Sequence, residues 1–446
     1  MTLLLGFYGD DFTGSTDAME ALYLKGYKSV LFLEAPPTHI LESMPTLQCI
    51  GVAGTSRAKD PDGMEQELRP VLTRLQELTP KIVHYKVCST FDSSPDVGSI
   101  GKAIEVANTI YTEQSHVPVM AGAPALGRYT LFGNHFAKSG DEVYRLDRHP
   151  IMSKHPSTPM QEADLGKHLA HQLSADIRYF TLVDNQPSEA LVDCYKKATA
   201  GDVVIHDCVD AEMLRRSARI IWETQDAPLF VVGSSGVEYG LADYWESETD
   251  ISPEKKTVYP LYAQDNVLVI SGSASMITKN QIDFAVSRGY TAVRIPNEIL
   301  QGKDPHDFLE YIQNLAEADK RLILFTALGP DDENIRHVKA YYAENGATPA
   351  EAAEVIGTIL GKLTKTIYST NGYARLVIAG GDTSGFITKT LGIDSLEVIQ
   401  SISPGAPLCI GKSFSHGETI EVALKGGQFG SEAYFLDVQN AASERE

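Results

Sequence analysis

Short apolar runs alternate with helical stretches from one end of the chain to the other. Most runs are bounded by Gly, Pro, Asn, Asp or Ser, a pattern that is typical of strands buried in a parallel sheet. The clearest examples are 29–33, 81–86, 117–121, 179–183, 203–207, 229–232, 266–270, 292–295, 322–325 and 375–379. This alternation predicts an α/β fold of largely parallel sheets flanked by helices.

A polar segment divides this pattern into two blocks. Residues 246–259, ESETDISPEKKTVY, carry a Pro among charged side chains, as linkers between domains do. We therefore expect one domain over residues 1–247 and a second over residues 260–440, each with its own largely parallel sheet. Two such domains facing a shared cleft are a common arrangement in enzymes with two substrates.

An acidic pair, Asp10 and Asp11, follows the first apolar run, 3–8. A helix is predicted directly after the pair, and three hydroxyl residues are candidates for its cap: Thr13, Ser15 and Thr16. Ligands of open α/β sheets bind at the carboxyl ends of strands, where this pair lies. Capping the helix is the simpler role, but a cap needs only one carboxylate.

Gly9 and Gly14 flank the acidic pair. Glycine is expected where the backbone approaches a ligand closely, because it has no side chain to keep the ligand away. The two glycines therefore favour a binding site at this turn.

The formal net charge of −21 argues against a nucleic-acid partner, because phosphate backbones are bound by clustered Lys and Arg. No apolar run approaches the 18 residues of a membrane span, so no membrane partner is expected. The five cysteines are scattered and form no C-x-x-C pair, which fits the reducing cytoplasm and offers no zinc framework. An anionic ligand would have to be bound locally, by backbone N–H groups, helix N-termini and a few cations.

Two further polar clusters of the first half are expected near the acidic pair. Arg57 ends the segment GVAGTSR, and HYKVCSTFDSSP (84–95) follows a predicted strand. The polar residues of the second segment that should emerge beside Asp10 are Lys86, Ser89, Thr90, Asp92 and Ser93. Arg57 and Lys86 can pair with a substrate carboxylate, or they can simply neutralise the acidic pair. Cys88 is a candidate nucleophile, although a bystander thiol is the commoner case.

Residues 127–160 hold three histidines, His135, His149 and His155. Their spacing does not match a helix-borne metal site. Pro150 and Pro156 predict an irregular segment, which is a substrate loop, a lid or an ordinary surface loop.

Glycine-rich turns between a strand and a helix recur in the second half. They lie in 267–282, 375–393 and 423–430, and the last turn carries one lysine, Lys425. A helix N-terminus preceded by glycines is a ready phosphate site. None of the turns is a Walker P-loop or follows G-x-G-x-x-G closely. Three such turns in one domain predict a nucleotide site. A similar turn in the first half, within 230–242, is equally consistent with an ordinary tight turn.

The ordered motifs together resemble the four-carbon acid sugar kinase family. They are GDDFTGSTD, SRA, KVCSTFDSS, GR…G…HPSTPM, GSAS…T…Q, GGDTSG and KGGQFG. The order covers nearly the whole chain, and the set is specific although each motif alone is modest. The resemblance implies a sugar-acid-binding first domain and an ATP-binding second domain. The implied reaction is phosphorylation of a hydroxyl of a short sugar acid by magnesium ATP, and a homodimer is the common assembly for enzymes of this size.

Matching positions imply contact residues for each ligand. The sugar acid is contacted by Asp11, Arg57, Lys86, Val87, Cys88 and Ser89. ATP is contacted by Ser273, Ser275, Gly380, Gly381, Asp382, Thr383 and Gly427.

Two stretches depart from the 3-oxo-tetronate members of the family. Gly133 is followed by Asn-His-Phe instead of His-Leu-Phe, and 121–124 reads AGAP where a Cys-Pro-Ala opening is expected. Because both departures lie toward the sugar end, four substrates stay open: D-threonate, D-erythronate, 3-oxo-tetronate and 3-oxo-isoapionate.

The expected mechanism places Arg57 and Lys86 on the substrate carboxylate, with Asp11 accepting the proton of the reacting hydroxyl. Asp10 then orients Asp11 or binds Mg²⁺, and Asp382 is a further candidate metal ligand. Closing the cleft between the domains would exclude water.

Two other functions stay open. One is a metal-dependent lyase or isomerase that uses the acidic pair and the histidines around His149. The other is a non-catalytic sensor that binds both ligands and releases no ADP.

Overall fold

The computed structural model describes residues 3–155, 157–198, 202–224, 228–254, 259–415 and 417–442. The chain forms two compact units, Met1–Lys256 (unit 1) and Thr257–Glu446 (unit 2). Parallel strands alternate with helices in both units, so the predicted α/β fold class is confirmed. Each of the ten apolar runs predicted to be strands overlaps a strand.

Unit 1 is built on a parallel sheet. Its strands lie in the order β2 (Ser29–Phe32), β3 (Cys49–Ala53), β1 (Leu5–Gly9), β4 (Ile82–Lys86), β11 (Leu229–Gly233), β5 (Val117–Met120), β10 (Val203–His206) and β9 (Ile177–Phe180). The chain leaves β1 toward β2 and β3 on one side, then returns past β1 to β4 on the other side. The carboxyl ends of β1 and β4 therefore flank a topological switch point, where ligands of such sheets bind.

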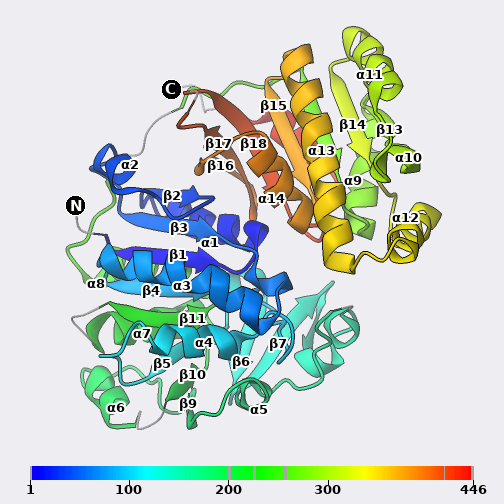
Figure 1. Ribbon diagram of the computed structural model, residues 1–446. Coiled ribbons are helices and arrows are strands. Elements are labelled where there is room, and N and C mark those ends of the chain that lie inside the picture. Colours follow the sequence, from blue (N-terminus) through cyan, green and yellow to red (C-terminus); the bar gives the residue numbers. More distant parts are fainter. Residues whose placement is uncertain are drawn as a thin grey trace. The chain divides into compact units, whose positions relative to one another are not determined.

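Helices cover both faces of this sheet. Figure 1 shows α3 (Pro61–Glu77) and α4 (Ile100–Asn108) in front of it, and these two helices pack on each other. In a second group of helices, α8 (Gly236–Glu248) packs on both α1 (Phe12–Leu24) and α7 (Ala211–Thr224). The remaining helical segments of unit 1 are α2 (Thr38–Glu42), α5 (Leu165–Ala170) and α6 (Leu191–Ala198), with single 3₁₀ turns at η1 (Ser56–Ala58), η2 (Pro124–Leu126), η3 (Leu146–Arg148) and η4 (Met152–Lys154).

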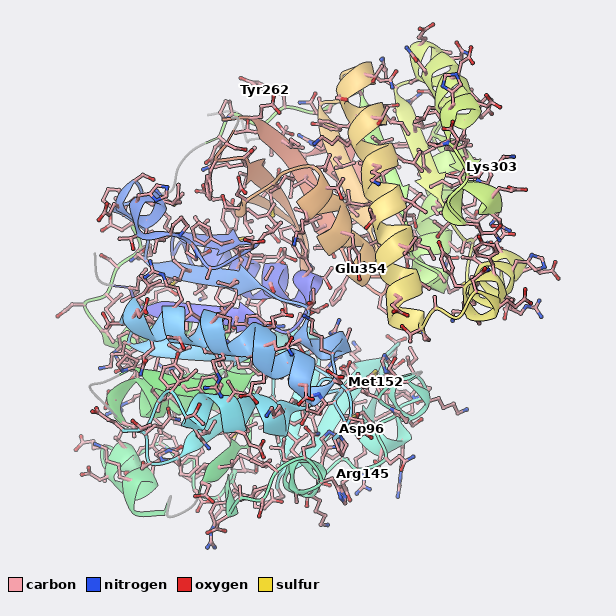
Figure 2. All side chains as sticks on the ribbon, viewed as in Figure 1. Asp96, Arg145, Met152, Tyr262, Lys303 and Glu354 are labelled. Carbon is pink, nitrogen blue, oxygen red and sulfur yellow. The ribbon has the colours of Figure 1, made fainter. Side chains whose placement is uncertain are left out.

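The segment 127–160 is more ordered than its prolines predicted. Its first half is a three-stranded antiparallel sheet of β6 (Arg128–Leu131), β7 (Asn134–Ser139) and β8 (Glu142–Arg145). Figure 2 marks the end of this sheet with Arg145 and the turns that follow with Met152. The interpretation as a wholly irregular loop or lid is therefore wrong for residues 128–145. Pro150 follows the last strand, so it does not interrupt the strand's pairing. Pro156 lies outside the described residues.

Unit 2 has a mixed sheet. Its strands lie in the order β13 (Thr291–Arg294), β14 (Arg321–Phe325), β12 (Val267–Ser271), β15 (Arg375–Ala379), β18 (Thr419–Lys425), β17 (Ala406–Lys412) and β16 (Ser395–Ser403). The pairs from β13 to β18 are parallel, and the last two are antiparallel. The chain leaves β12 toward β13 and β14, then crosses back to β15. The carboxyl ends of β12 and β15 therefore flank a topological switch point, as those of β1 and β4 do in unit 1.

The helices of unit 2 also lie on both faces of its sheet. In Figure 1, α13 (Pro349–Asn371) and α14 (Gly381–Thr390) lie in front, and they pack on each other. On the other side lies α9 (Met276–Ser287), and it packs on α15 (Tyr434–Asn440). The outer helices are α10 (Asn297–Leu300), α11 (His306–Ala318) and α12 (Glu333–Glu344). Each unit has its own apolar core. Among the described residues, no helix is both long enough and apolar enough to cross a bilayer.

A buried arginine anchors the C-terminal helix of unit 2. Arg375, the first residue of β15, is fully buried, and its Nε and Nη2 donate to Glu421 Oε2 at 2.7 and 2.5 Å. Its guanidinium also donates to backbone carbonyls near α15 and before β12, those of Tyr262, Val438, Gln439 and Ala441. A guanidinium offers five N–H donors, so one side chain satisfies all of these acceptors.

Replacing this arginine should destabilise unit 2. We expect Arg375→Met to lower the free energy of unfolding by about 3–5 kcal/mol, because Glu421 and several carbonyls lose their donor. Arg321 provides a matched control, since it begins β14 and faces the same residue, Val267, from the other side. Its pair with Asp319 is partly exposed, at 3.5 Å, and Arg321→Met should cost less than about 1 kcal/mol. Denaturant unfolding of both variants tests this, and equal losses would contradict it.

Candidate active site

The carboxyl ends of β1 and β4 bring the predicted sugar-acid residues together. Gly9 faces Lys86 across the two strands, and the Asp10 N–H donates to the carbonyl of Lys86 at 2.9 Å. Arg57 lies in η1, directly after β3, and its N–H donates to the Asp10 carbonyl at 3.0 Å. Three segments that are distant in sequence therefore meet at the switch point of unit 1.

Asp11 itself caps the helix that follows. Its Oδ1 accepts from the Gly14 N–H at 2.9 Å, and its Oδ2 accepts from Thr13 Oγ1 at 2.9 Å. The predicted hydroxyl caps are wrong: Ser15 and Thr16 instead donate to carbonyls of the preceding turn. Asp11 precedes the first helical residue, Phe12, and so reaches the Gly14 N–H, whereas the three hydroxyl residues lie inside the helix.

The flanking glycines make room for the protein's own side chains. A Cβ on Gly9 would lie 1.9 Å from Ser15 Oγ, and a Cβ on Gly14 would lie 2.3 Å from Asp11 Oδ1 and 3.0 Å from Lys86 Nζ. The turn is thus tight because buried polar groups fill it. Both glycines are required at this turn whether or not a ligand is bound.

Asp10 differs sharply from its neighbour. Its side chain is 3% exposed, and its Oδ1 is a buried oxygen without a hydrogen-bond partner in the described structure. Burial raises the pKa of Asp10 from its ordinary value of 3.8 to about 7, with Arg57 and Asp11 acting in opposite directions. A buried acceptor with no donor costs free energy. Asp10 is therefore a group prepared to accept a hydrogen bond or a proton.

Lys86 is a buried cation of the site. It is 1% exposed, and its Nζ lies 3.7 Å from Asp17 Oδ2. Burial alone lowers a lysine pKa, but the carboxylates of Asp17, Asp10 and Asp11 outweigh it and raise the pKa of Lys86. Lys86 is therefore a permanent cation that is balanced by acidic neighbours.

Arg57 is the accessible cation of the site. Its Nη2 lies 2.5 Å from Asp11 Oδ2, and its side chain is 27% exposed. No other side-chain hydrogen bond of Arg57 is found in the described ranges, so its remaining N–H donors can meet a ligand. Burial would raise the pKa of Asp92, but Arg57 and the Thr90 hydroxyl lower it. Arg57 thus serves several carboxylates at once.

The segment after Lys86 has mixed surroundings. The Val87 side chain is buried in the core of unit 1, and its N–H donates to Gly233 O at 2.7 Å. Burial raises the pKa of the Cys88 thiol to about 12, which makes it a poor nucleophile. The Ser89 carbonyl lies 2.9 Å from His135 Nε2. Of the predicted contacts in this stretch, Cys88 and Ser89 are the partly exposed ones.

A hollow of about 520 Å³ adjoins this segment at Ser93. Ser93 Oγ lies 2.8 Å from His168 Nε2 and accepts from Gln172 Nε2 at 2.9 Å. Burial lowers the pKa of His168 to about 4, so the ring is neutral near pH 7. This wall of the hollow is polar and uncharged, which suits hydroxyl groups.

The three predicted histidines do not form a metal site. Burial lowers the pKa of His135 to about 4, and the Nδ1 atom of this ring lies 3.0 Å from Thr130 Oγ1. His149 Nδ1 accepts from the N–H groups of Ile151 and Met152. His155 is bonded to Thr158. Within the described ranges, no three His, Cys, Asp or Glu side chains are grouped as metal ligands.

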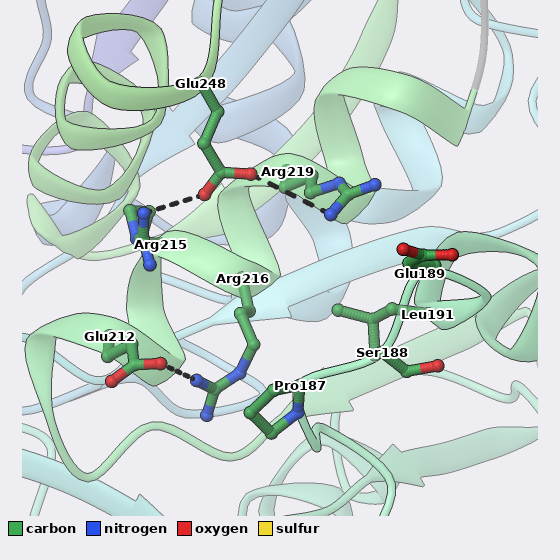
Figure 3. A pocket seen from close by; sticks show the side chains of 9 residues that line it. All are labelled: Pro187, Ser188, Glu189, Leu191, Glu212, Arg215, Arg216, Arg219 and Glu248. Atoms are coloured by element: carbon green, nitrogen blue, oxygen red, sulfur yellow. Dashed lines mark hydrogen bonds and ion pairs between the residues drawn. The ribbon is translucent and has the colours of Figure 1, made fainter.

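A second hollow of unit 1 contains none of the predicted site residues. Figure 3 shows its nine lining residues, among them Arg215, Arg216 and Arg219 of α7. Arg215 and Arg219 pair with Glu248, and Arg216 pairs with Glu212. These arginines are already neutralised, so the hollow is a solvated cluster of ion pairs and not a strong anion site.

In unit 2 the predicted ATP residues meet between β12 and α9. Ser275 caps α9 by accepting from the Thr278 N–H at 3.0 Å, and its hydroxyl donates to the Gly427 carbonyl. Thr278 Oγ1 lies 3.0 Å from Ser273 Oγ. A Cβ on Gly427 would approach Ser273 Oγ to 2.8 Å. This turn therefore requires glycine to pack on the serines.

The GGDTSG turn joins β15 to α14. Gly380 has a φ of 135°, which strongly favours glycine, and its N–H donates to the Lys425 carbonyl at 2.9 Å. Thr383 packs on Gly272, where a Cβ would lie 2.1 Å from Thr383 Oγ1. Gly381 begins the helix, while the Asp382 side chain lies outside the described structure. The starts of α9 and α14 thus lie at adjacent strand ends.

Sequence reasoning passed over two residues that the structure brings to these sites. Asp17 lies one helical turn after Thr13 in the motif GDDFTGSTD, and this spacing places both on one face of α1. His168 carried no signal, because it reaches Ser93 only through tertiary contact.

Comparison with known proteins matches both units. The family model described as a sugar-binding N-terminal domain matches residues 5–241, and the one described as a nucleotide-binding C-terminal domain matches residues 268–435. The chain is 38% identical to a 3-oxo-isoapionate kinase of Paraburkholderia graminis, over 97% of this chain and 93% of that protein. It is 26% identical to a 3-oxo-tetronate kinase of Brucella melitensis, over 99% and 96% respectively.

Solved structures share the fold. A Salmonella typhimurium protein superposes with a TM-score of 0.77 at 22% identity, over 98% of this chain and 99% of that one. A Haemophilus influenzae protein has a TM-score of 0.71 at 23% identity, over 97% and 99%.

The environment of Asp10 predicts a pH-dependent stability effect. Its pKa is raised in the folded state, so the contribution of its protonated form is full below about pH 4 and is lost as the pH rises through about 7. Asparagine mimics the protonated acid. We therefore expect Asp10→Asn to raise Tm relative to the parent chain, by about 5 °C more at about pH 8 than at about pH 5.

Asp11→Asn is the matched control for this measurement, because Asp11 is bonded to Arg57 and Gly14. It should lower Tm at about pH 8, since the ion pair is lost. Thermal melts of both variants across this pH range give the answer. A stabilisation by Asp10→Asn that does not grow with pH would contradict the assignment.

Proposed function

We propose that this chain, which belongs to the four-carbon acid sugar kinase family, is an ATP-dependent kinase that phosphorylates a hydroxyl of a short sugar acid. The sugar acid binds at the switch point of unit 1 and ATP at that of unit 2. Support comes from the two matched domains, from the named activities of the full-length relatives and from the charges found at each switch point.

A branched 3-oxo sugar acid is the proposed substrate. The relative at 38% identity is named for 3-oxo-isoapionate, whereas those named for 3-oxo-tetronate are 26–27% identical. The polar hollow beside Ser93, whose uncharged wall of Ser93, His168 and Gln172 suits hydroxyl groups, gives room for additional hydroxyl-bearing carbon atoms. 3-Oxo-isoapionate is therefore the first compound to test.

The observation that carries the mechanism is the unpartnered Oδ1 of Asp10. Both oxygens of Asp11 already accept hydrogen bonds, from Gly14 and Thr13, and Arg57 holds one of them in an ion pair. We therefore assign the proton-accepting role to Asp10, and a positioning role to Asp11. A pKa of about 7 leaves Asp10 partly ionised near neutral pH, which suits a general base.

The substrate carboxylate pairs with Arg57, the exposed cation, by the two-pronged geometry that guanidinium and carboxylate share. Lys86 lies deeper and balances Asp17 and Asp10. The substrate hydroxyl then donates to Asp10. As its oxygen bonds to the γ-phosphorus, the proton passes to Asp10, the bond from phosphorus to the β–γ bridging oxygen breaks, and ADP leaves.

In unit 2 the phosphates of ATP lie against the starts of α9 and α14, where free N–H groups and helix dipoles favour anions. Mg²⁺ typically binds to phosphate oxygens together with one or two carboxylates. We propose that it enters as magnesium ATP and neutralises the charge that develops on the phosphates. Residues 273–275 and 380–383 position the nucleotide.

The cytoplasm is the proposed location, because it supplies ATP and keeps thiols reduced. Among the described residues, Cys49, Cys88 and Cys208 form no disulfide. A homodimer stays a prediction from base rates alone.

A coupled ADP-release assay over a panel of sugar acids tests the function. We expect ADP release that depends on both magnesium ATP and the acceptor, strongest with 3-oxo-isoapionate and weaker with 3-oxo-tetronate, D-threonate and D-erythronate. Conversion of a sugar acid without ATP would identify a lyase or isomerase. Binding of both ligands without ADP release would identify a sensor, and either result would overturn the proposal.

Paired aspartate variants test the base assignment. Asp10→Asn should lower kcat by about 10²–10⁴-fold, because the hydroxyl loses its proton acceptor. Asp11→Asn should act mainly on KM, by about tenfold, since Arg57 loses its orienting partner.

Asp60→Asn serves as the control for these variants. Asp60 caps α3 by accepting from the Gly63 N–H at 2.8 Å, as Asp11 caps α1. It should leave both constants near those of the parent chain. A larger loss of kcat in Asp11→Asn than in Asp10→Asn would return the base role to Asp11.

A further inference from the structure

We propose that Lys425, the last residue of β18, binds the phosphate chain of the nucleotide through its ammonium group. This inference rests on the proposed function, because it takes unit 2 to be the ATP-binding unit. It assigns a charged contact to a site whose predicted residues are otherwise glycines, hydroxyl residues and Asp382.

The backbone and the side chain of Lys425 serve different elements. Its backbone faces Ala379 of β15, and its carbonyl accepts from the Gly380 N–H, which fixes the turn that begins α14. Its Nζ donates to Thr278 Oγ1 at 3.0 Å, in the first turn of α9. The Lys425 ammonium group therefore lies beside the start of α9, while the Lys425 backbone carbonyl fixes the turn that begins α14.

Nothing in the described structure neutralises this lysine. Lys425 is 0% exposed, Thr278 accepts its one hydrogen bond, and no ion pair of Lys425 is found in the described ranges. An ammonium group has three donors. Burying a cation without a counter-charge is unfavourable, so a lysine held in this way is expected to have a ligand that supplies the missing charge.

Lys86 of unit 1 provides an internal comparison. Each lysine is the last residue of its strand, β4 or β18, and both side chains are almost fully buried. Carboxylates around Lys86 raise its pKa, whereas burial lowers the pKa of Lys425 to about 7. The difference is the counter-charge, which the protein supplies in unit 1 and leaves to a ligand in unit 2.

Polyphosphate is the ligand chemistry that fits this place. The N–H groups at the start of α9, the nearby Ser273 hydroxyl and the Lys425 ammonium all favour a dense negative charge. A bound phosphate would hold Lys425 protonated. Above about pH 7 the free protein must therefore take up a proton when nucleotide binds, and its affinity should fall with rising pH.

Three variants test this inference. Lys425→Met removes the charge and keeps an apolar stem, and Lys425→Arg keeps the charge. Lys279→Met is the control, since Lys279 also lies in the first turn of α9 but is partly exposed and pairs with Asp283 at 2.6 Å. Calorimetric titration with ADP and with ATP, from about pH 7.5 to about pH 9, measures affinity while the nucleotide is fully ionised.

We expect Lys425→Met to weaken nucleotide binding by about 10- to 100-fold at about pH 7.5, and Lys279→Met to change it by less than about threefold. Binding to the parent chain should weaken with rising pH, and titrations in buffers of different ionisation enthalpy should show proton uptake. Both effects should disappear in Lys425→Met. Arginine stays charged at every pH used, so in Lys425→Arg proton uptake should also be absent.

Thermal melting without nucleotide separates a ligand role from a structural one. If Lys425 only supported the fold, Lys425→Met would lower Tm. As an unneutralised buried cation, it should instead raise Tm by about 2–4 °C when removed. Undiminished nucleotide affinity or a lower Tm in a folded Lys425→Met would overturn the inference. Failure of the parent chain to bind nucleotide would overturn the proposed function itself.

Discussion

Holding charged side chains out of water at the end of a parallel sheet is unfavourable unless something neutralises them, and this cost governs both units. In unit 1 the buried carboxylates of Asp10 and Asp17 surround the buried ammonium of Lys86. In unit 2 Lys425 has a hydroxyl neighbour and no acidic partner in the described structure. Both places therefore have a charge or an acceptor left over, and we propose that a ligand of matching chemistry completes them.

Sheet topology explains why these charges gather where they do. In each unit the chain leaves a central strand, β1 or β12, to one side and later returns to the other side of it, at β4 or β15. The strand ends at that point are followed by helices that depart in different directions, so they leave room for a ligand. The polar residues that follow these strands meet there although they are distant in sequence. For this reason, the positions of the strand ends, which the apolar runs indicate, are enough to predict that Asp10, Arg57 and Lys86 lie together.

Other features depended on contacts that the sequence does not display. The apolar runs predicted the parallel strands, but the antiparallel strands of 128–145 have exposed polar faces and lack a buried run. Asp11 caps the helix and Asp10 does not, because Asp11 is one residue nearer to the Gly14 N–H in the chain. The anchoring role of Arg375 requires α15 to fold back on its strand. Each of these is decided by tertiary packing, which local propensity does not encode.

Charge also distinguishes the proposed sugar-acid site from the proposed nucleotide site, although the chain as a whole carries −21. A triphosphate brought to the unit 1 site would meet the carboxylates of Asp10, Asp11 and Asp92, with Arg57 as the accessible cation. A sugar acid brings a single carboxylate for Arg57 and hydroxyls that donate to Asp10, so its charge and its donors are both used. In unit 2 a sugar acid would leave most of the N–H groups of two helix starts unused, whereas a polyphosphate can accept from several of them and from Lys425. Each site thus disfavours the other anion, because binding that anion would leave charged groups or hydrogen-bonding groups of the site unpaired.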